Sequence, residues 1–133
     1  MTALLALAAG LGLAAVTGWL LTRRRGVLRE ADGPAADPEL LGLSRTGPTV
    51  VHVSAPWCGP CAAVRRVVKQ VCTELDVAHN EIDIDANPVA ARALSVLSLP
   101  TTFIFDAEGV QRFRSSGVPT ADALRSALRA LLA

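Results

Sequence analysis

Hydrophobic and polar positions divide this chain into three regions with different patterns. Residues 3–21 contain no charged side chain, and a helix of that length spans about 28 Å, close to the hydrocarbon thickness of a bilayer. Residues 26–48 mix Gly, Pro, Asp and Arg without a sustained period, which is typical of a linker. From residue 49 onward, short apolar runs alternate with amphipathic stretches. The pattern predicts an apolar helix, a linker and one folded domain.

The third region predicts alternating strands and helices. Residues 49–54 (TVVHVS) are nearly continuous in apolar side chains, as in a strand covered on both faces. In residues 62–75 the valines recur at 3.6-residue spacing, which indicates an amphipathic helix. The other expected elements are a strand at residues 81–84, a helix that begins at Asn87-Pro88, a hairpin formed by residues 101–105 and 110–114, and a helix at residues 121–132.

The apolar first region is expected to be a membrane anchor, with residues 3–21 inside the bilayer. A signal peptide usually has basic residues before its apolar core, whereas here Arg23, Arg24 and Arg25 follow the apolar run and none precedes it. Arginines near a transmembrane end are retained in the cytoplasm. We therefore expect a single-pass membrane protein with its N-terminus outside and its catalytic domain in the cytoplasm. A cleaved signal peptide, a buried helix and the outward topology stay open as alternatives.

Composition limits the functions that the folded region can have. The chain has 13 basic and 12 acidic residues and a net charge of +1, so nothing indicates a nucleic-acid partner. Three cysteines in 133 residues are too few for a disulfide-stabilised scaffold and suit one catalytic pair with a third cysteine apart.

Two cysteines lie in the sequence WCGPC, residues 57–61, between the predicted strand at 49–54 and the helix that follows. A helix start offers free backbone N–H groups and the positive end of its dipole to a thiolate. Cys58 is therefore the predicted nucleophile. Cys61 lies one turn further on and is the predicted resolving cysteine. A zinc site would need two more ligands, and only Cys72, His52 and His79 are available, so no metal is expected.

The motif WCGPC resembles the active site of the thioredoxin family, and residues 98–103 (SLPTTF) resemble its cis-proline loop. The resemblance implies an α/β thioredoxin-like fold: a central mixed sheet of about four strands flanked by helices, with a shortened N-terminal part, after one transmembrane helix. The expected division is an anchor at 1–22, a basic juxtamembrane segment and linker at 23–48, and a thioredoxin-like domain at 49–133. Within the linker, Asp37-Pro38-Glu39 favours one short helix.

The resemblance implies a thiol–disulfide oxidoreductase that reduces protein disulfides through Cys58 and Cys61, and the apolar segment at residues 3–21 predicts that it is membrane-tethered. Its partners would be disulfide-containing proteins and a reductase that supplies electrons, and it would need no cofactor beyond its redox-active disulfide. Leu99 and Pro100 would bind the extended substrate chain. The other implied substrate-binding residues are Trp57, Gly59, Pro60 and Gly117. Two alternatives stay open: an outward-facing reductase or isomerase of exported proteins, and a non-catalytic redox-sensing docking module.

Three residues depart from the family pattern. His52 stands where the family typically has a buried aspartate, and Glu81 where it has a lysine. Our hypothesis is that His52 accepts the proton of Cys61 and is oriented by Glu81; a histidine simply buried in the strand is the alternative. Ser54 replaces a tryptophan, so we expect a more polar groove.

Cys72 lies eleven residues after Cys61, which in a helix is about 16 Å, too far for a disulfide. We expect a buried structural cysteine, with a regulatory thiol as the alternative.

Overall fold

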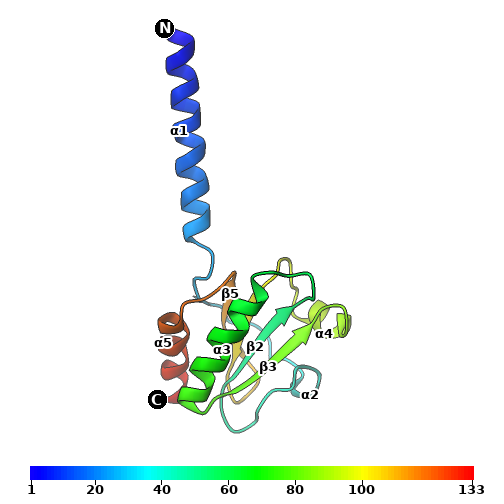
Figure 1. The fold of residues 1–133 in the computed structure, drawn as a ribbon. Coiled ribbons are helices and arrows are strands. Elements are labelled where there is room, and N and C mark those ends of the chain that lie inside the picture. Colours follow the sequence, from blue (N-terminus) through cyan, green and yellow to red (C-terminus); the bar gives the residue numbers. More distant parts are fainter.

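The computed structural model describes residues 1–133 and shows a five-stranded mixed sheet between two layers of helices (Figure 1). Helix α1 (Thr2–Arg23) stands away from this domain and none of its residues is buried. By length and composition α1 can cross a membrane, with a mean hydropathy of 2.1 over its most apolar window, but a signal sequence shares both properties.

The sheet has the strand order β1-β5-β4-β2-β3. Its strands are β1 (Arg29–Glu30), β2 (Thr49–Ser54), β3 (Ala78–Asp83), β4 (Thr101–Phe105) and β5 (Gln111–Ser116). β2 pairs in parallel with β3, and the other pairs are antiparallel. The prediction of about four strands missed β1, because two charged residues carry no strand periodicity. β3 also begins three residues before the predicted start at residue 81, where its mostly exposed side chains give no apolar pattern.

Helices cover both faces of the sheet (Figure 1). Helices α3 (Cys61–Leu75) and α5 (Ala121–Leu132) share one core with alternate residues of β2 and β4, among them Val50 and Ile104. Helices α2 (Pro38–Leu41) and α4 (Pro88–Ala93) share the other core with Val51, Val53 and Phe103. Every residue of β2 is buried because its side chains alternate between these two cores.

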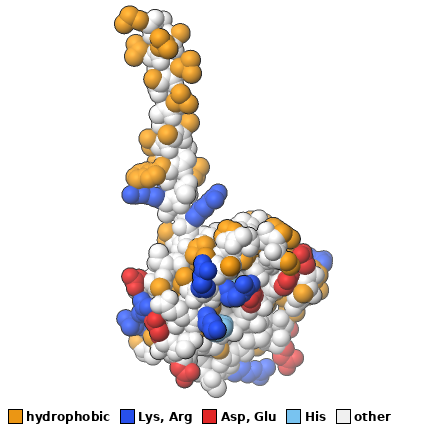
Figure 2. Space-filling view, viewed as in Figure 1, with side chains coloured by type: hydrophobic (Ala, Val, Ile, Leu, Met, Phe, Trp, Pro, Cys, Tyr) orange, Lys and Arg blue, Asp and Glu red, His pale blue; other side chains and the backbone are white.

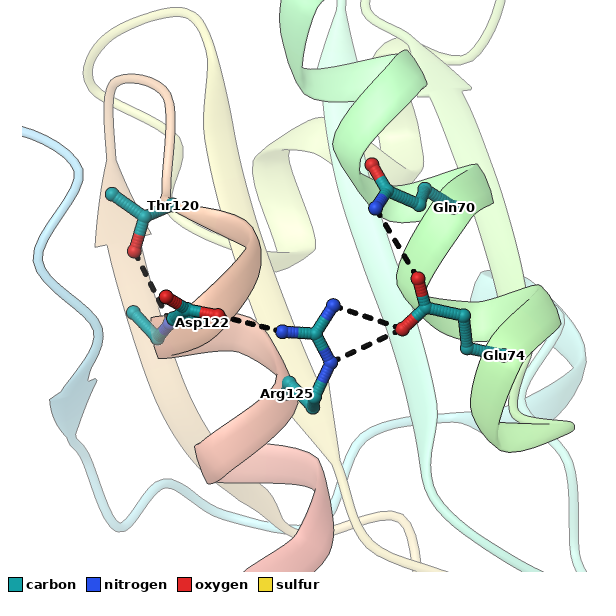
Figure 3. Close-up of polar contacts among 6 residues, drawn as sticks. Gln70, Glu74, Thr120, Asp122 and Arg125 are labelled. Atoms are coloured by element: carbon teal, nitrogen blue, oxygen red, sulfur yellow. Dashed lines mark hydrogen bonds and ion pairs between the residues drawn. The ribbon is translucent and has the colours of Figure 1, made fainter.

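An ion-pair network joins the two helices on the α3 face (Figure 3). The guanidinium of Arg125 donates to Glu74 Oε2 at 2.9 and 3.1 Å and to Asp122 Oδ1 at 2.7 Å, and Gln70 donates to the other oxygen of Glu74. The bond from Arg125 lowers the pKa of Glu74. Thr120 caps α5 by accepting a hydrogen bond from Ala123 N, as a helix N-cap does. The network links α5 to α3, the helix that begins with Cys61.

The segment that we expected to be a linker packs on the domain. Its short helix forms as predicted, with Asp37 accepting hydrogen bonds from the first turn of α2. Leu41 and Leu43 are buried in the core beside α4. Strand β1 pairs with β5, and Gly26 N donates to Ser116 O at 2.5 Å. The segment is polar overall, and backbone pairing with a few apolar side chains holds it in place, which its composition does not reveal.

Three loops that contain candidate active-site residues lie at one end of the sheet. The register pairs Val53 at the end of β2 with Thr101 at the start of β4, and Thr101 with Ser116 at the end of β5. We call the end formed by Ser54, Thr101 and Ser116 the site edge. The loop that carries WCGPC, the loop that contains Pro100 and the loop from β5 to α5 all lie there.

Candidate active site

Cys58 and Cys61 form a disulfide at the site edge, with their Cα atoms 5.5 Å apart. Cys58 lies in the turn before α3, where its N–H donates to Ala55 O at 3.1 Å. Cys61 is the first residue of α3, and Pro60, at the N-cap position, provides no side-chain cap for that helix end. Cys58 is partly exposed, whereas Cys61 is only 2% exposed. Cys58 is thus accessible to a disulfide of another protein, whereas Cys61 is shielded.

An apolar groove of about 390 Å³ lies beside Cys58. Its lining residues are Trp57, Cys58, Gly59, Pro60, Ile84, Val96, Leu97, Ser98 and Leu99. None of them is charged, and Trp57 and Leu97 are 71% and 92% exposed. The expected polar groove is therefore wrong: Ser54 is buried and donates to Glu81 at 2.8 Å instead of lining the groove.

The loop before β4 brings Leu99 and Pro100 to the same place. The Leu99–Pro100 peptide bond is cis, as the resemblance implies. Pro100 O accepts a hydrogen bond from Gly117 N at 2.9 Å, which ties this loop to the loop from β5 to α5. Leu99 lines the groove opposite the dithiol turn.

Gly117 lies at the site edge but does not line the groove. Its φ of +91° is one that other residues rarely adopt, and a Cβ there would lie 3.1 Å from Gly26 N and 3.2 Å from Arg25 Cβ. A side chain at Gly117 would thus meet the protein's own segment at Arg25 and Gly26. The resemblance implied only a substrate-binding role for Gly117 and missed this contact, because nothing in the sequence places the segment there.

His52 is buried in β2, with 2% of its surface exposed, and its Nδ1 atom has no hydrogen-bond partner. Burial lowers the pKa of His52, and the nearby Glu81 carboxylate partly opposes this shift. The imidazole is therefore neutral at pH 7 and able to take up a proton.

Glu81 is next to His52 in the register of β2 and β3, but its carboxylate binds other groups. Arg65 on α3 donates to both carboxylate oxygens, and Ser54 donates to one. The bond from Arg65 is the main cause that holds the pKa of Glu81 at about 2. No hydrogen bond joins Glu81 to His52, so Glu81 acts on the imidazole through its charge and does not orient it by contact.

Sequence reasoning missed two neighbours of His52. Thr102 lies opposite His52, and Ser115 lies opposite Thr102, in one row across β2, β4 and β5. The hydroxyl oxygens of both are buried and, like Nδ1 of His52, have no hydrogen-bond partner. The row faces α3 and α5, since it has the same alternation as Val50 and Ile104. The available signal was a polar residue at an inward position in each of the largely apolar strands β2 and β4, His52 and Thr102; Ser115 lies in the polar strand β5 and gives no such signal.

Cys72 is buried in the core under α3 and only 1% exposed. Burial raises the pKa of its thiol to about 12, so the thiolate that would react is scarcely populated at neutral pH. Both findings agree with a structural cysteine.

A disulfide at a strand-to-helix junction beside a cis-proline, with Cys58 partly exposed and Cys61 buried, is the arrangement typical of thiol–disulfide oxidoreductases. The family model described as Thioredoxin matches residues 42–130. The chain belongs to the thioredoxin family. The match begins within the former linker, which agrees with the burial of Leu43.

Individual proteins show the same similarity. The chain is 41% identical to the thioredoxin of Mycolicibacterium smegmatis over 71 residues, which cover 50% of this chain and 62% of that protein. It is 40% identical over 67 residues to the bifunctional thioredoxin reductase/thioredoxin of Mycobacterium leprae, covering 47% of this chain and 14% of that protein. A mutant thioredoxin from Halobacterium salinarum NRC-1 superposes with a TM-score of 0.64 at 28% identity, covering 73% of this chain and 86% of that one.

Proposed function

We propose that this protein reduces disulfides in other proteins through Cys58 and Cys61. The observation that carries the proposal is the disulfide between a partly exposed residue, Cys58, and a buried one, Cys61, beside an apolar groove. In the reduced protein, Cys58 Sγ attacks a substrate disulfide; that S–S bond breaks, and the released sulfur takes a proton from solvent. Cys61 Sγ then attacks Cys58 Sγ and releases the second substrate sulfur. Two electrons pass to the substrate, and the Cys58–Cys61 disulfide remains.

We propose that His52 accepts the proton that Cys61 loses before its attack. Two observations support this role. His52 lies on the face of the sheet that α3 covers, and Cys61 is the first residue of α3. The imidazole is neutral, and its Nδ1 atom has no hydrogen-bond partner. The proton then passes to the second substrate sulfur as it leaves, so the imidazole is neutral again at the end of the cycle. Glu81 favours the imidazolium through its charge.

The substrate chain is proposed to lie along the apolar groove. Trp57, Gly59 and Pro60 form one wall of it, and Leu99 offers backbone groups to an extended chain by adding a strand at the site edge. Pro100 and Gly117 hold that loop in place through their hydrogen bond. The proposed chemistry uses no metal or organic cofactor, because the two electrons come from the reduced thiols of Cys58 and Cys61, which end as the disulfide.

An insulin-reduction assay tests the activity. We expect Cys58→Ser and Cys61→Ser to abolish turnover, and Cys72→Ser, which removes the buried thiol outside the site, to retain it. Cys61→Ser should also accumulate a mixed disulfide between Cys58 and the substrate. Turnover that survives Cys58→Ser would contradict the proposal and favour a docking role.

A reductase is proposed as the electron donor. The Mycobacterium leprae relative is named as a bifunctional thioredoxin reductase/thioredoxin, which suggests a thioredoxin reductase as the electron donor for this chain. The test is NADPH oxidation by a thioredoxin reductase in the presence of the oxidised protein and insulin. A rate that does not rise with the concentration of this protein would exclude such a donor.

We propose residues 1–22 as a single-pass anchor, with its N-terminus outside and the thioredoxin domain in the cytoplasm. Trp19 and Arg23 lie at the C-terminal end of α1, where the guanidinium stacks 3.7 Å from the indole ring centre; aromatic and basic residues of this kind are typical of a membrane interface. Residues 23–48 join the anchor to the domain at 49–133 and pack against it through β1, Leu41 and Leu43. A compartment-specific reporter fused to the C-terminus tests the topology, and a signal confined to the outside would overturn it.

A further inference from the structure

We propose that the short connection between α1 and the sheet holds the site edge against the membrane surface, so that the substrates are membrane proteins whose disulfides lie at that surface. The inference rests on the proposed reductase activity and on the proposed anchor, but it does not depend on which side of the membrane the domain occupies. It deepens the proposed function by naming a substrate class.

The connection is too short to let the domain turn away from the bilayer. Helix α1 ends at Arg23, and Gly26 N already donates to Ser116 O at the site edge. Three Cα steps separate these residues, which extend to about 11 Å at most. The end of the apolar helix is therefore held close to the edge of the sheet that carries the dithiol (Figure 1).

Two glycines fix this contact. Gly26 has a φ of +80°, and a Cβ on it would overlap the backbone oxygen of Val118. Gly117 has a φ of +91°, and its Cβ would lie 3.1 Å from Gly26 N. The two backbones approach so closely only because neither residue has a side chain. β1 then continues the attachment by pairing Arg29 with Arg114 of β5.

The loop that Gly26 contacts belongs to the candidate active site. Gly117 N donates to Pro100 O, and the adjacent Leu99 lines the groove with Cys58. Along the sheet, β5 and β2 are separated by β4 alone, or about 10 Å at the usual strand spacing. The end of α1 and the dithiol turn therefore lie at the same end of the domain, a few strand spacings apart.

The surface at this end suits a membrane. Trp57, Leu97 and Val118 are exposed apolar residues in loops at the site edge, and Figure 2 shows hydrophobic side chains gathered where the domain faces α1. Arg23, Arg24 and Arg25 at the junction offer positive charge to lipid phosphates. The opposite end of the sheet, where β2 starts, carries the exposed Arg45.

Tryptophan quenching tests the orientation because the chain has two tryptophans, Trp19 in α1 and Trp57 beside the dithiol. The full-length protein is reconstituted in phosphatidylcholine–phosphatidylglycerol vesicles with spin-labelled headgroups. We expect strong quenching of Trp57 in a Trp19→Phe variant. A matched variant, Trp19→Phe with Trp57→Phe and Arg45→Trp, reports the opposite end and should be quenched much less. Equal quenching of the two positions would overturn the inference.

The same vesicles distinguish failure of the inference from failure of the anchor. In Trp57→Phe, labels on the acyl chains should quench Trp19. Loss of that quenching contradicts the anchor itself, whereas quenched Trp19 with unquenched Trp57 contradicts the orientation alone. Insulin reduction by the wild-type protein in these vesicles tests the reductase activity separately.

A pair of glycine substitutions tests the connection. Gly26→Ala introduces the clash with Val118 O and should release the domain, which lowers Trp57 quenching towards that of Arg45→Trp. Gly33→Ala is the control in the same segment, because its Cβ would meet only the side chain of Gln111, at ordinary distances of 3.4 to 3.8 Å. Unchanged quenching in Gly26→Ala would show that this contact does not hold the domain.

The substrate class is tested with a disulfide peptide attached to lipid headgroups by a short link or by a flexible linker of about 20 residues, whose mean span is roughly 25 Å. A site that faces the bilayer reduces the short-linked peptide at least as fast as the long-linked one. Reduction of the long-linked peptide alone would show a site that faces away. Gly26→Ala should reverse the preference, and Gly33→Ala should keep it.

Discussion

The carboxylate of Glu81 on β3 is bound at both oxygens by the guanidinium of Arg65 on α3, next to the buried His52 on β2. The contact joins the helix that carries Cys61 to the strand beside His52. It places one positive and one negative group near an imidazole that has no hydrogen-bond partner at Nδ1. Burial is the main cause that lowers the pKa of His52; the charge of Glu81 opposes it and the charge of Arg65 adds to it, so the pair modifies how readily the buried imidazole takes up a proton.

Arg65→Ala should raise the pKa of Glu81 from about 2 towards its ordinary value of 4.5, because the main cause of the low value is the hydrogen bond from Arg65. Carboxyl chemical shifts followed by NMR during an acid titration measure this change. Arg65→Lys is the matched variant. It keeps the positive charge but loses the bidentate contact, so we expect the pKa of Glu81 to be intermediate between those of the wild type and Arg65→Ala. An unchanged titration in Arg65→Ala would show that the contact does not form in solution.

His52→Ala should slow disulfide reduction on the order of 10²-fold near neutral pH, the lower range for loss of a general base. The rate should then rise with pH as hydroxide and solvent remove the Cys61 proton instead. Insulin reduction measured from pH 6 to 9 gives both results. His79→Ala, at an exposed position of β3, is the control. A His52→Ala profile that matches wild type in rate and shape would remove His52 from the mechanism.

His52 should also make the folded protein sensitive to mild acid. Its pKa in the folded state lies below the ordinary 6.5, so the unfolded chain binds this proton more tightly. The contribution to stability is complete above pH 6.5 and is lost as the pH falls towards the folded pKa. Glu81, with a folded pKa of about 2, loses its contribution only below about pH 4.5. Urea unfolding from pH 4.5 to 7.5 should show a slope that His52→Gln removes.

The dithiol and the sheet with helices on both faces were predictable because their signals are local. WCGPC is contiguous, β2 shows a run of buried residues, and in the valine stripe of α3 Val64, Val68 and Val71 are buried and Val67 is partly buried. The cis bond before Pro100 was likewise indicated by a short motif. Each of these features is encoded within about fifteen residues.

Features that depend on contacts between residues far apart in the sequence could not be predicted from it. Arg65 and Glu81 are sixteen residues apart; Arg65 looks like an ordinary surface charge in the sequence, and Glu81 was expected to contact His52, until the crossover brings α3 over β3. β1 exists only because β5 lies beside it. Gly117 was assigned to the groove by family pattern, whereas its closest neighbours are Arg25 and Gly26, which no motif connects to it.

Cys72 should be unreactive in the folded, reduced protein. Its thiol is buried and has a pKa of about 12, whereas Cys58 is partly exposed at a helix start. Iodoacetamide at pH 7.5 should modify Cys58 first and leave Cys72 unmodified until urea is added, as measured by peptide mass spectrometry. Modification of Cys72 at a rate similar to that of Cys58 in the native protein would instead support a regulatory thiol.

Leu41 tests whether the segment before β2 is part of the folding unit. Its side chain is 1% exposed and lies in the core with Val53 and Phe105, so Leu41→Ala should lower the free energy of unfolding by about 2–5 kcal/mol. Leu132→Ala, at a position that is 47% exposed, is the matched control and should change it by about 0.5 kcal/mol or less. Urea unfolding monitored by circular dichroism measures both variants. Equal, small effects would mean that residues 23–48 form a tether outside the cooperative unit, whereas a large effect at Leu41 alone extends that unit back to α2.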